Sequence, residues 1–363
     1  MTKAICTGME DVGLKLFGTK NVVIASNKSM GGLIQGSLRR WNVKLEKGAN
    51  MLGVGTTGGV RRTTGTTVAR IALLTKRAGC FAKLRRMGIN VARVLATGGT
   101  AVATYGMACQ GAGDYMLLQL RRTVAGIIGG SAAGKDPNMV LIAAGAKAGL
   151  ASDPAFAAHV EPIGQWAEAV WHRSLPGMLL HASVAKVKQA LLAAKRPWAV
   201  VKGPAAATVA SAARIGWTMM DAVSAVTDTG RVVDFQLDSP AMIRKLVRES
   251  VKRWRWRVAE ASFPSLAASG GRGAVWEPIQ ALIKSGKWAP PGQIQGQPPK
   301  EAELTNGERA ALRSAVSGGQ WPQDRLFKAS LVDHPFCILC MNHGIEKRGT
   351  FANRYYECET VNH

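Results

Sequence analysis

The chain has 363 residues, of which 47% are hydrophobic, so it can bury the cores of two or three domains. Its 47 lysines and arginines outnumber its 23 aspartates and glutamates, which gives a formal net charge of +24 at pH 7. This composition excludes a largely disordered chain. The charge favours a polyanionic partner, nucleic acid or an anionic membrane surface, over a basic protein without one.

The cysteines and the N-terminal sequence indicate an intracellular location. Six cysteines at uneven spacing do not form the disulfide framework of a small secreted protein. Residues 1–20 lack the apolar core of a signal peptide, and no apolar run approaches the roughly 18 residues of a membrane-spanning helix. We therefore expect an intracellular, nuclear protein whose partner is nucleic acid and not a membrane.

Residues 1–60 predict short strands and one helix. Three short apolar or β-branched runs are typical of strands: 21–26, 43–45 and 51–54. A helical pattern begins at Ser29, and its expected inner face is apolar: Leu33, Ile34, Leu38 and Trp41.

Residues 61–135 predict a basic helical region. The loop 55–67 carries Arg61 and Arg62 but lacks the Gly-Lys-Ser/Thr ending of a phosphate-binding loop, so we interpret it as a flexible basic loop. Helix 68–87 has an apolar stripe, and its remaining surface is purely cationic: Arg70, Lys76, Arg77, Lys83, Arg85 and Arg86. Because a solvated helix usually mixes charges of both signs, this surface indicates phosphate contacts. Helix 114–128 is expected to turn Arg121 and Arg122 outward.

Residues 136–285 predict a helical connector interrupted by one hairpin. Four helices are expected first: 137–148, 153–171, 178–194 and 205–217. Trp166 and Trp171 are the expected core anchors of the second. The hairpin pairs 223–226 with 232–235. A helix capped by Ser239 then carries a second set of cations, of which we assign three to nucleic-acid binding: Arg248, Lys252 and Arg253.

Residues 286–303 are rich in proline, glycine and glutamine and predict a linker. Residues 304–363 predict a helical lead-in, opened by a capping box from Thr305 to Glu308, and then a cysteine-rich unit. The fold class indicated by these elements is mainly α with a few short strands (α+β). No nucleophile and base with catalytic spacing can be read from the sequence, so we assign no catalytic residue.

The cysteine-rich unit predicts a zinc site. Cys337 and Cys340 have the Cys-x2-Cys spacing with which zinc takes two corners of a tetrahedron, and Cys358 supplies a third thiol. A Cys-x2-Cys, His-x4-Cys knuckle would place histidine at 353, where this chain has Asn353. His343 is our candidate for the fourth ligand, with His334 and His363 as alternatives. The other interpretation is that these three cysteines are free thiols of a site that has lost a ligand.

The order of several motifs resembles the region downstream of the catalytic palm in non-LTR retrotransposon reverse transcriptases, in particular the arginine-rich reading frames of this type in dinoflagellate genomes. The motifs are the Leu-Gly-Val segment at 52–54, the basic helix, Tyr-Gly at 105–106, Leu-x-x-Leu-Arg-Arg at 117–122 and the terminal knuckle with Gly349, Thr350, Arg354 and Cys358. The resemblance implies that the chain is a thumb, connector and zinc region that grips RNA or an RNA–DNA hybrid. We further hypothesise that the knuckle adds a local contact to the nucleic acid through Arg354, Tyr355 and Tyr356.

The sequence departs from that family in two respects: no Asp-Asp dipeptide occurs in it, and Asn353 stands where the knuckle has its histidine. We therefore expect a nucleic-acid-binding fragment without polymerase chemistry of its own. Two alternatives stay open: part of a complete RNA-directed DNA polymerase whose catalytic half lies upstream, or a non-functional relic of a retroelement. An adaptor for anionic proteins is less well supported, because two separate cationic helices exceed what such a partner needs.

Overall fold

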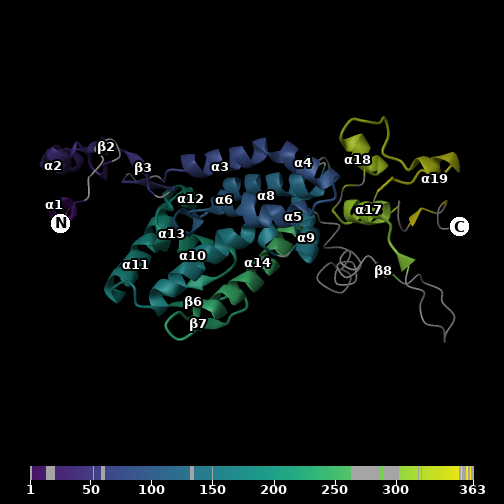
Figure 1. Cartoon of the computed structure of the whole chain (residues 1–363). Coiled ribbons are helices and arrows are strands. Elements are labelled where there is room, and N and C mark those ends of the chain that lie inside the picture. Colours follow the sequence, from purple (N-terminus) through teal and green to yellow (C-terminus); the bar gives the residue numbers. More distant parts are fainter. Residues whose placement is uncertain are drawn as a thin grey trace.

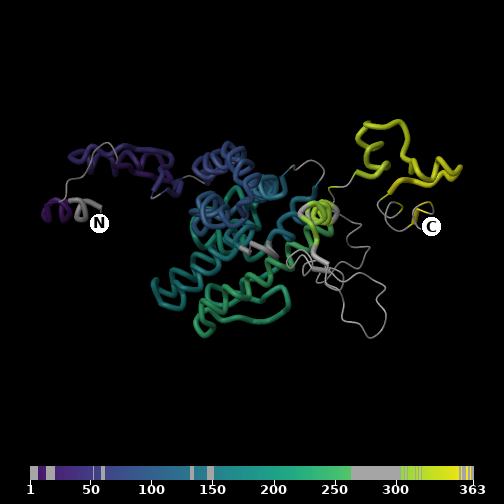
Figure 2. The backbone as a smooth tube through the Cα atoms, turned by 45° about the vertical axis from the view of Figure 1, so that its right-hand side comes forward, coloured from purple at the N-terminus to yellow at the C-terminus, as the bar shows by residue number. Residues whose placement is uncertain are grey.

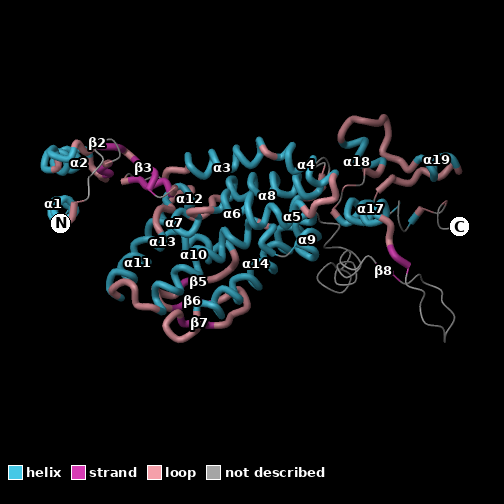
Figure 3. Tube along the Cα trace, viewed as in Figure 1, coloured by secondary structure: helices cyan, strands magenta, loops and turns pink. Residues whose placement is uncertain are grey.

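A computed structural model gives the fold, and it describes residues 2–13, 21–51, 53–58, 62–130, 135–148, 150–262, 287–288, 302–317, 319, 321–350, 353, 357–358 and 360. The described chain is mainly helical, with a few short strands, as the sequence predicts (Figures 1 and 3). Figures 1 and 2 place the N-terminal and C-terminal units on opposite sides of a central helical body. None of the described helices is long and apolar enough to cross a membrane.

The N-terminal unit is built from short elements. Its helices are α1 (Thr2–Asp11), α2 (Lys28–Ser37) and the 3₁₀ turn Arg39–Trp41, and its strands are β1 (Val22–Ile24), β2 (Lys44–Glu46), β3 (Gly48–Met51) and β4 (Val54–Thr57). β1 pairs with β2 in parallel, and β3 with β4 in antiparallel. Helix α1 was not predicted. The strand expected at 51–54 is wrong, because Gly53 adopts a positive φ of 79° in the turn between β3 and β4.

The basic helix predicted at 68–87 is two helices, α3 (Gly65–Lys76) and α4 (Ala78–Arg86), joined at Arg77. Behind them lie α5 (Val91–Val94), a π-helical turn (Leu95–Gly99), α6 (Thr100–Thr104), α7 (Met107–Gln110) and α8 (Asp114–Gly129). The predicted inner face of α8 is confirmed, since Leu117, Leu120, Val124 and Ile127 are all buried. These side chains form one core cluster with Leu74 of α3 and Leu95.

The connector contains the largest core. Its elements are α9 (Pro137–Ala148), a 3₁₀ turn (Leu150–Ser152), α10 (Pro154–Trp171), α11 (Gly177–Ala193), α12 (Pro197–Val200), α13 (Pro204–Arg214), β5 (Thr218–Met219), β6 (Ser224–Val226), β7 (Val232–Asp234) and α14 (Pro240–Ser262). The predicted hairpin is confirmed as β6 and β7, and β5 adds a third antiparallel strand to it. Ser239 caps α14, as predicted, by accepting a hydrogen bond from the Met242 amide.

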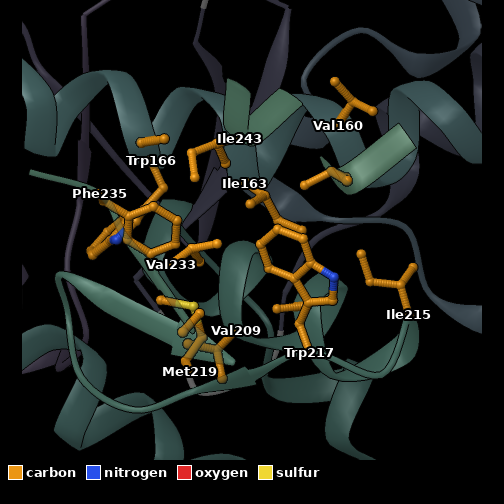
Figure 4. Packing of buried hydrophobic residues seen from close by; sticks show 14 of the residues in the cluster. Val160, Ile163, Trp166, Val209, Ile215, Trp217, Met219, Val233, Phe235 and Ile243 are labelled. Atoms are coloured by element: carbon orange, nitrogen blue, oxygen red, sulfur yellow. The ribbon is translucent and has the colours of Figure 1, made fainter. Parts of the chain in front are cut away.

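Figure 4 shows this core, with Trp166 and Phe235 together on one side of it and Trp217 on the other. Trp166 donates to the Ala222 carbonyl and Trp217 to the Ser250 hydroxyl, so both buried indole N–H groups are satisfied. The expectation for Trp171 is wrong. It ends α10 and its side chain is exposed, because the helix leaves the core at that point.

The C-terminal unit contains β8 (Lys287–Trp288), β9 (Ala302–Glu303), α17 (Asn306–Val316), α18 (Gln323–Lys328) and α19 (Ile338–Asn342). The capping box is confirmed, since Thr305 and Glu308 exchange side-chain and backbone hydrogen bonds. Leu312 and Val316 pack on a cluster from α9 and α14, which fixes α17 to the helical body. Most of the predicted linker lies outside the described residues.

Candidate nucleic-acid interface and metal centre

Helices α3 and α4 form the upper edge of the helical body in Figure 1, where they lie nearly in line. Lys76, at the end of α3, is exposed, and so are Lys83 and Arg86, whose spacing of three residues places them on one face of α4. Arg77, at the junction, is exposed too. None of these four cations forms an ion pair with the described residues, and neither helix contains an acidic residue. We call these four side chains the cationic ridge.

Other predicted binding arginines in this region are bonded to the protein's own backbone. Arg70 donates to the carbonyls of Tyr105 and Gly53 at 2.9 and 2.7 Å. Arg85 donates to the Ile127 carbonyl at 2.8 Å. Arg62 donates to the Gln110 carbonyl, and burial lowers its pKa. These three guanidinium groups join the loop, α3 and α4 to the body, so their first role is positional. Arg61 lies outside the described residues.

The prediction that Arg121 points outward is wrong. Arg121 is buried and binds Asp153 with two hydrogen bonds, at 3.0 and 3.1 Å, while its third nitrogen donates to Asn138. Arg255 of α14 approaches the same carboxylate at 3.2 Å and is also buried. Burial opposes ionisation of Asp153, but the two arginines hold its pKa below the usual range. Neither arginine can reach a phosphate. Arg122, the next residue along α8, is exposed.

The second cationic surface, on α14, is largely neutralised by ion pairs. Arg253 makes a bidentate pair with Asp228 at 2.6 and 2.7 Å, and Lys252 pairs with Glu249 at 2.8 Å. Arg244 pairs with Glu168 of α10. Of the three α14 residues assigned to binding, Arg248 alone is exposed without an ion pair among the described residues. Of the two predicted cationic surfaces, the one on α14 is therefore mostly paired with acids. The ridge is the one whose four exposed cations form no ion pair with the described residues.

A hollow of about 660 Å³ opens between the starts of α3 and α8 and the helix α12. Tyr115 and Trp198 line it, with Arg62 and Arg196 beside them. Two guanidinium groups approach the Trp198 ring, with the Cζ atoms of Arg214 and Arg62 at 4.0 and 5.9 Å from its centre. The apolar sequence neighbours of Trp198 indicate that it packs in the protein. They do not reveal its contacts with Arg62 and Arg214, because the three residues come from separate segments of the chain.

The three predicted cysteine ligands do converge. The sulfur atoms of Cys337, Cys340 and Cys358 all lie within 4.8 Å of one another, and Cys340 and Cys358 are 3.6 Å apart. Cys337 precedes α19 and Cys340 lies inside it, so a single turn presents both thiols. An antiparallel bridge between Phe336 and Arg348 closes the loop around them, and the Cys337 amide donates to the Lys347 carbonyl. Such a group of thiols can hold a metal ion.

The electrostatics of the two buried thiols differ. Burial raises the pKa of the Cys340 thiol. Burial also opposes ionisation of Cys358, but hydrogen bonds from Cys340 and Thr360 outweigh it and lower the pKa of Cys358. Of these two thiols, Cys358 is therefore the more readily ionised, and a cysteine binds metal as its thiolate.

Asn353, and not His343, completes the surroundings of the thiols. Asn353 is buried, and its Nδ2 lies 3.7 Å from the Cys340 sulfur. His343 is exposed at the end of α19, and the cluster of potential metal ligands does not include it or His334. The assignment of His343 as fourth ligand therefore has no geometric support in the described chain. Arg354, Tyr355, Tyr356 and His363 lie outside the described residues.

Comparisons with protein-family models, with curated proteins and with solved structures found no match to this chain. A function for the protein can therefore be inferred only from the geometry of its own ridge and thiol cluster and from the motifs in its sequence.

Proposed function

We propose that the chain binds nucleic acid through the cationic ridge. The observation that carries the proposal is that Lys76, Arg77, Lys83 and Arg86 are exposed and form no ion pair with the described residues, while most arginines of α14 are bonded to acids or buried. Side chains of this kind are free to replace the counterions of a phosphate backbone. Arg122 and Arg93 are exposed on the neighbouring helices α8 and α5 and extend the positive surface.

The test is a triple variant, Arg77→Ala, Lys83→Ala and Arg86→Ala. Binding should weaken alike for all sequences, and the slope of log affinity against log salt should flatten by about one unit for each phosphate that is no longer neutralised. The matched control is Lys186→Ala, Lys195→Ala and Lys245→Ala, three exposed lysines elsewhere with the same loss of charge. Equal binding by the ridge variant and the control would refute the assignment.

We infer from the resemblance to reverse transcriptases that the preferred ligand is RNA or an RNA–DNA hybrid. Fluorescence anisotropy with a structured RNA, a DNA duplex and a hybrid, across salt concentrations, measures the preference. Weak binding to all three at physiological salt would instead support the interpretation that the chain is a non-functional relic of a retroelement. An in-frame Phe/Tyr-x-Asp-Asp segment encoded upstream of Met1 would support the complete polymerase.

We also propose that the thiol cluster holds zinc. The support is the convergence of three sulfurs from two distant segments, in a chain with no disulfide among its described cysteines. The purified full chain should contain about one zinc ion, measured by elemental analysis, and Cys340→Ser should lose it. Cys80→Ser is the control, because Cys80 is exposed on α4 and far from the cluster in sequence. Zinc retained by the Cys340 variant would contradict the proposal.

A further inference from the structure

We propose that Asn353 is the fourth ligand of the metal centre and binds the ion through its side-chain oxygen. This inference rests on the proposed zinc site and extends it. With Asn353 as a ligand, the three thiols of the knuckle, which lacks its histidine, gain the fourth member of a tetrahedral set. It also explains why a polar amide is buried beside three sulfur atoms.

The side-chain oxygen of Asn353 lacks a partner. Asn353 is 1% exposed, and its Oδ1 has no hydrogen-bond partner in the described chain. Leaving a buried amide oxygen without a hydrogen-bond partner is unfavourable. A cation is the kind of partner that would satisfy it. The backbone amide of Asn353 donates to the Thr350 hydroxyl at 3.1 Å, so the residue's main chain is held in place while its side chain faces the thiols.

The distances around the thiols fit a set of four ligands. With zinc–sulfur bonds of about 2.3 Å and a zinc–oxygen bond of about 2.1 Å, a tetrahedron has sulfur–sulfur edges of about 3.8 Å and sulfur–oxygen edges of about 3.6 Å. Cys340 and Cys358 are 3.6 Å apart, and the end of the Asn353 amide that faces Cys340 is 3.7 Å from its sulfur. The amide therefore lies at the separation of a fourth ligand from the Cys340 sulfur.

The Asn353 amide can present either of its ends to the thiols. The two ends of an asparagine side chain differ little in shape, so rotation by 180° about the last bond exchanges Nδ2 and Oδ1 without moving the neighbouring side chains. With thiols, the amide nitrogen can face sulfur as a weak donor. With thiolates and a divalent cation, the oxygen takes its place, because zinc accepts oxygen ligands and cannot accept an N–H group.

Asparagine could instead support the site only as an N–H donor to the Cys340 thiolate. The two roles respond oppositely to Asn353→Asp. That variant keeps an oxygen ligand and makes it anionic, which strengthens ligation. The variant also removes the N–H donor and places a negative charge beside a thiolate. If Asn353 acts only as a donor, these changes weaken metal binding.

The experiment measures zinc and cobalt(II) affinity of the full chain, by competition with a chelator and by cobalt absorption. We expect Asn353→Ala to weaken binding at least about tenfold and Asn353→Asp to bind at least as tightly as the natural residue. Asn353→His should also bind tightly, and His343→Ala should change nothing. Cobalt in the natural chain should give the intense visible absorption of a tetrahedral site.

Weaker binding by Asn353→Asp, or unchanged binding by Asn353→Ala, would overturn the assignment of Asn353 and leave zinc binding by the thiols intact. Absence of zinc and cobalt binding in the natural chain would overturn both proposals. Circular dichroism of each variant tests whether a loss of affinity reflects a loss of the helical fold. Helix α19, which carries Cys340, lies outside the helical body in Figure 1.

Discussion

At the scale of single residues, the partner within reach decides what an arginine does. Arg121 and Arg122 are adjacent in sequence, yet Arg121 is buried against Asp153 and Arg122 is exposed. Asp153 accepts two hydrogen bonds from Arg121 and forms an ion pair with Arg255. It also caps α10, because its Oδ1 accepts a hydrogen bond from the Ala155 amide at 2.9 Å. One carboxylate thus joins α8, α10 and α14.

Replacing this carboxylate should be costly. Asp153→Ala leaves two buried guanidinium groups without a counterion, and we expect it to lower the free energy of unfolding by roughly 3–5 kcal/mol. Glu249→Ala breaks the exposed pair with Lys252 and should cost less than about 1 kcal/mol. Urea denaturation of both variants measures the difference. Similar losses in the two would mean that the buried network contributes little.

At the scale of elements, α10 is the central helix of the body. It contacts α7, α8, α13 and α14, and nearly its whole length is buried. His159 lies in its middle, donates from Nδ1 to the Ala155 carbonyl at 2.6 Å, and packs against Trp254. Burial, and then the charge of Arg214, lower its pKa to about 3. The helix therefore carries a histidine that stays neutral when the protein is folded.

This histidine should make stability depend on pH. Below pH 6.5 the unfolded chain binds a proton at His159 that the folded chain excludes down to about pH 3, so acid favours unfolding. The free energy of unfolding should fall by up to about 1.4 kcal/mol per pH unit between about pH 6.5 and 4.5. Denaturation curves at several pH values should show a shallower slope for His159→Gln. The exposed His172→Gln is the control and should keep the natural slope.

At the scale of the whole molecule, the charge of +24 is unevenly distributed. Most arginines of α14 form ion pairs with Asp228, Glu168 or Asp153, while the ridge on α3 and α4 has no acid near it in sequence. The thiol cluster lies in a separate unit that reaches the body through α17. A nucleic acid on the ridge and a metal in the terminal unit would thus be held by different parts of the chain.

Sequence alone determined the fold class, most helices of the body, the β6–β7 hairpin, the capping box and the convergence of three thiols. These features depend on local pattern: periodic apolar residues, turn residues and the Cys-x2-Cys spacing. The same local reasoning identified the cations of α3 and α4, because an absence of acids over two helices is visible in the sequence.

Only the tertiary structure decided which cations are free and which residue completes the surroundings of the thiols. Arg121, Arg255 and Arg70 look like surface cations by sequence, but Asp153 and the backbone carbonyls that hold them come from distant segments. Likewise, His343 is near Cys340 in sequence and is exposed, whereas Asn353 is buried beside it. Spacing gives the order of ligands along a chain, but the direction of a side chain depends on how the loops that carry it fold together.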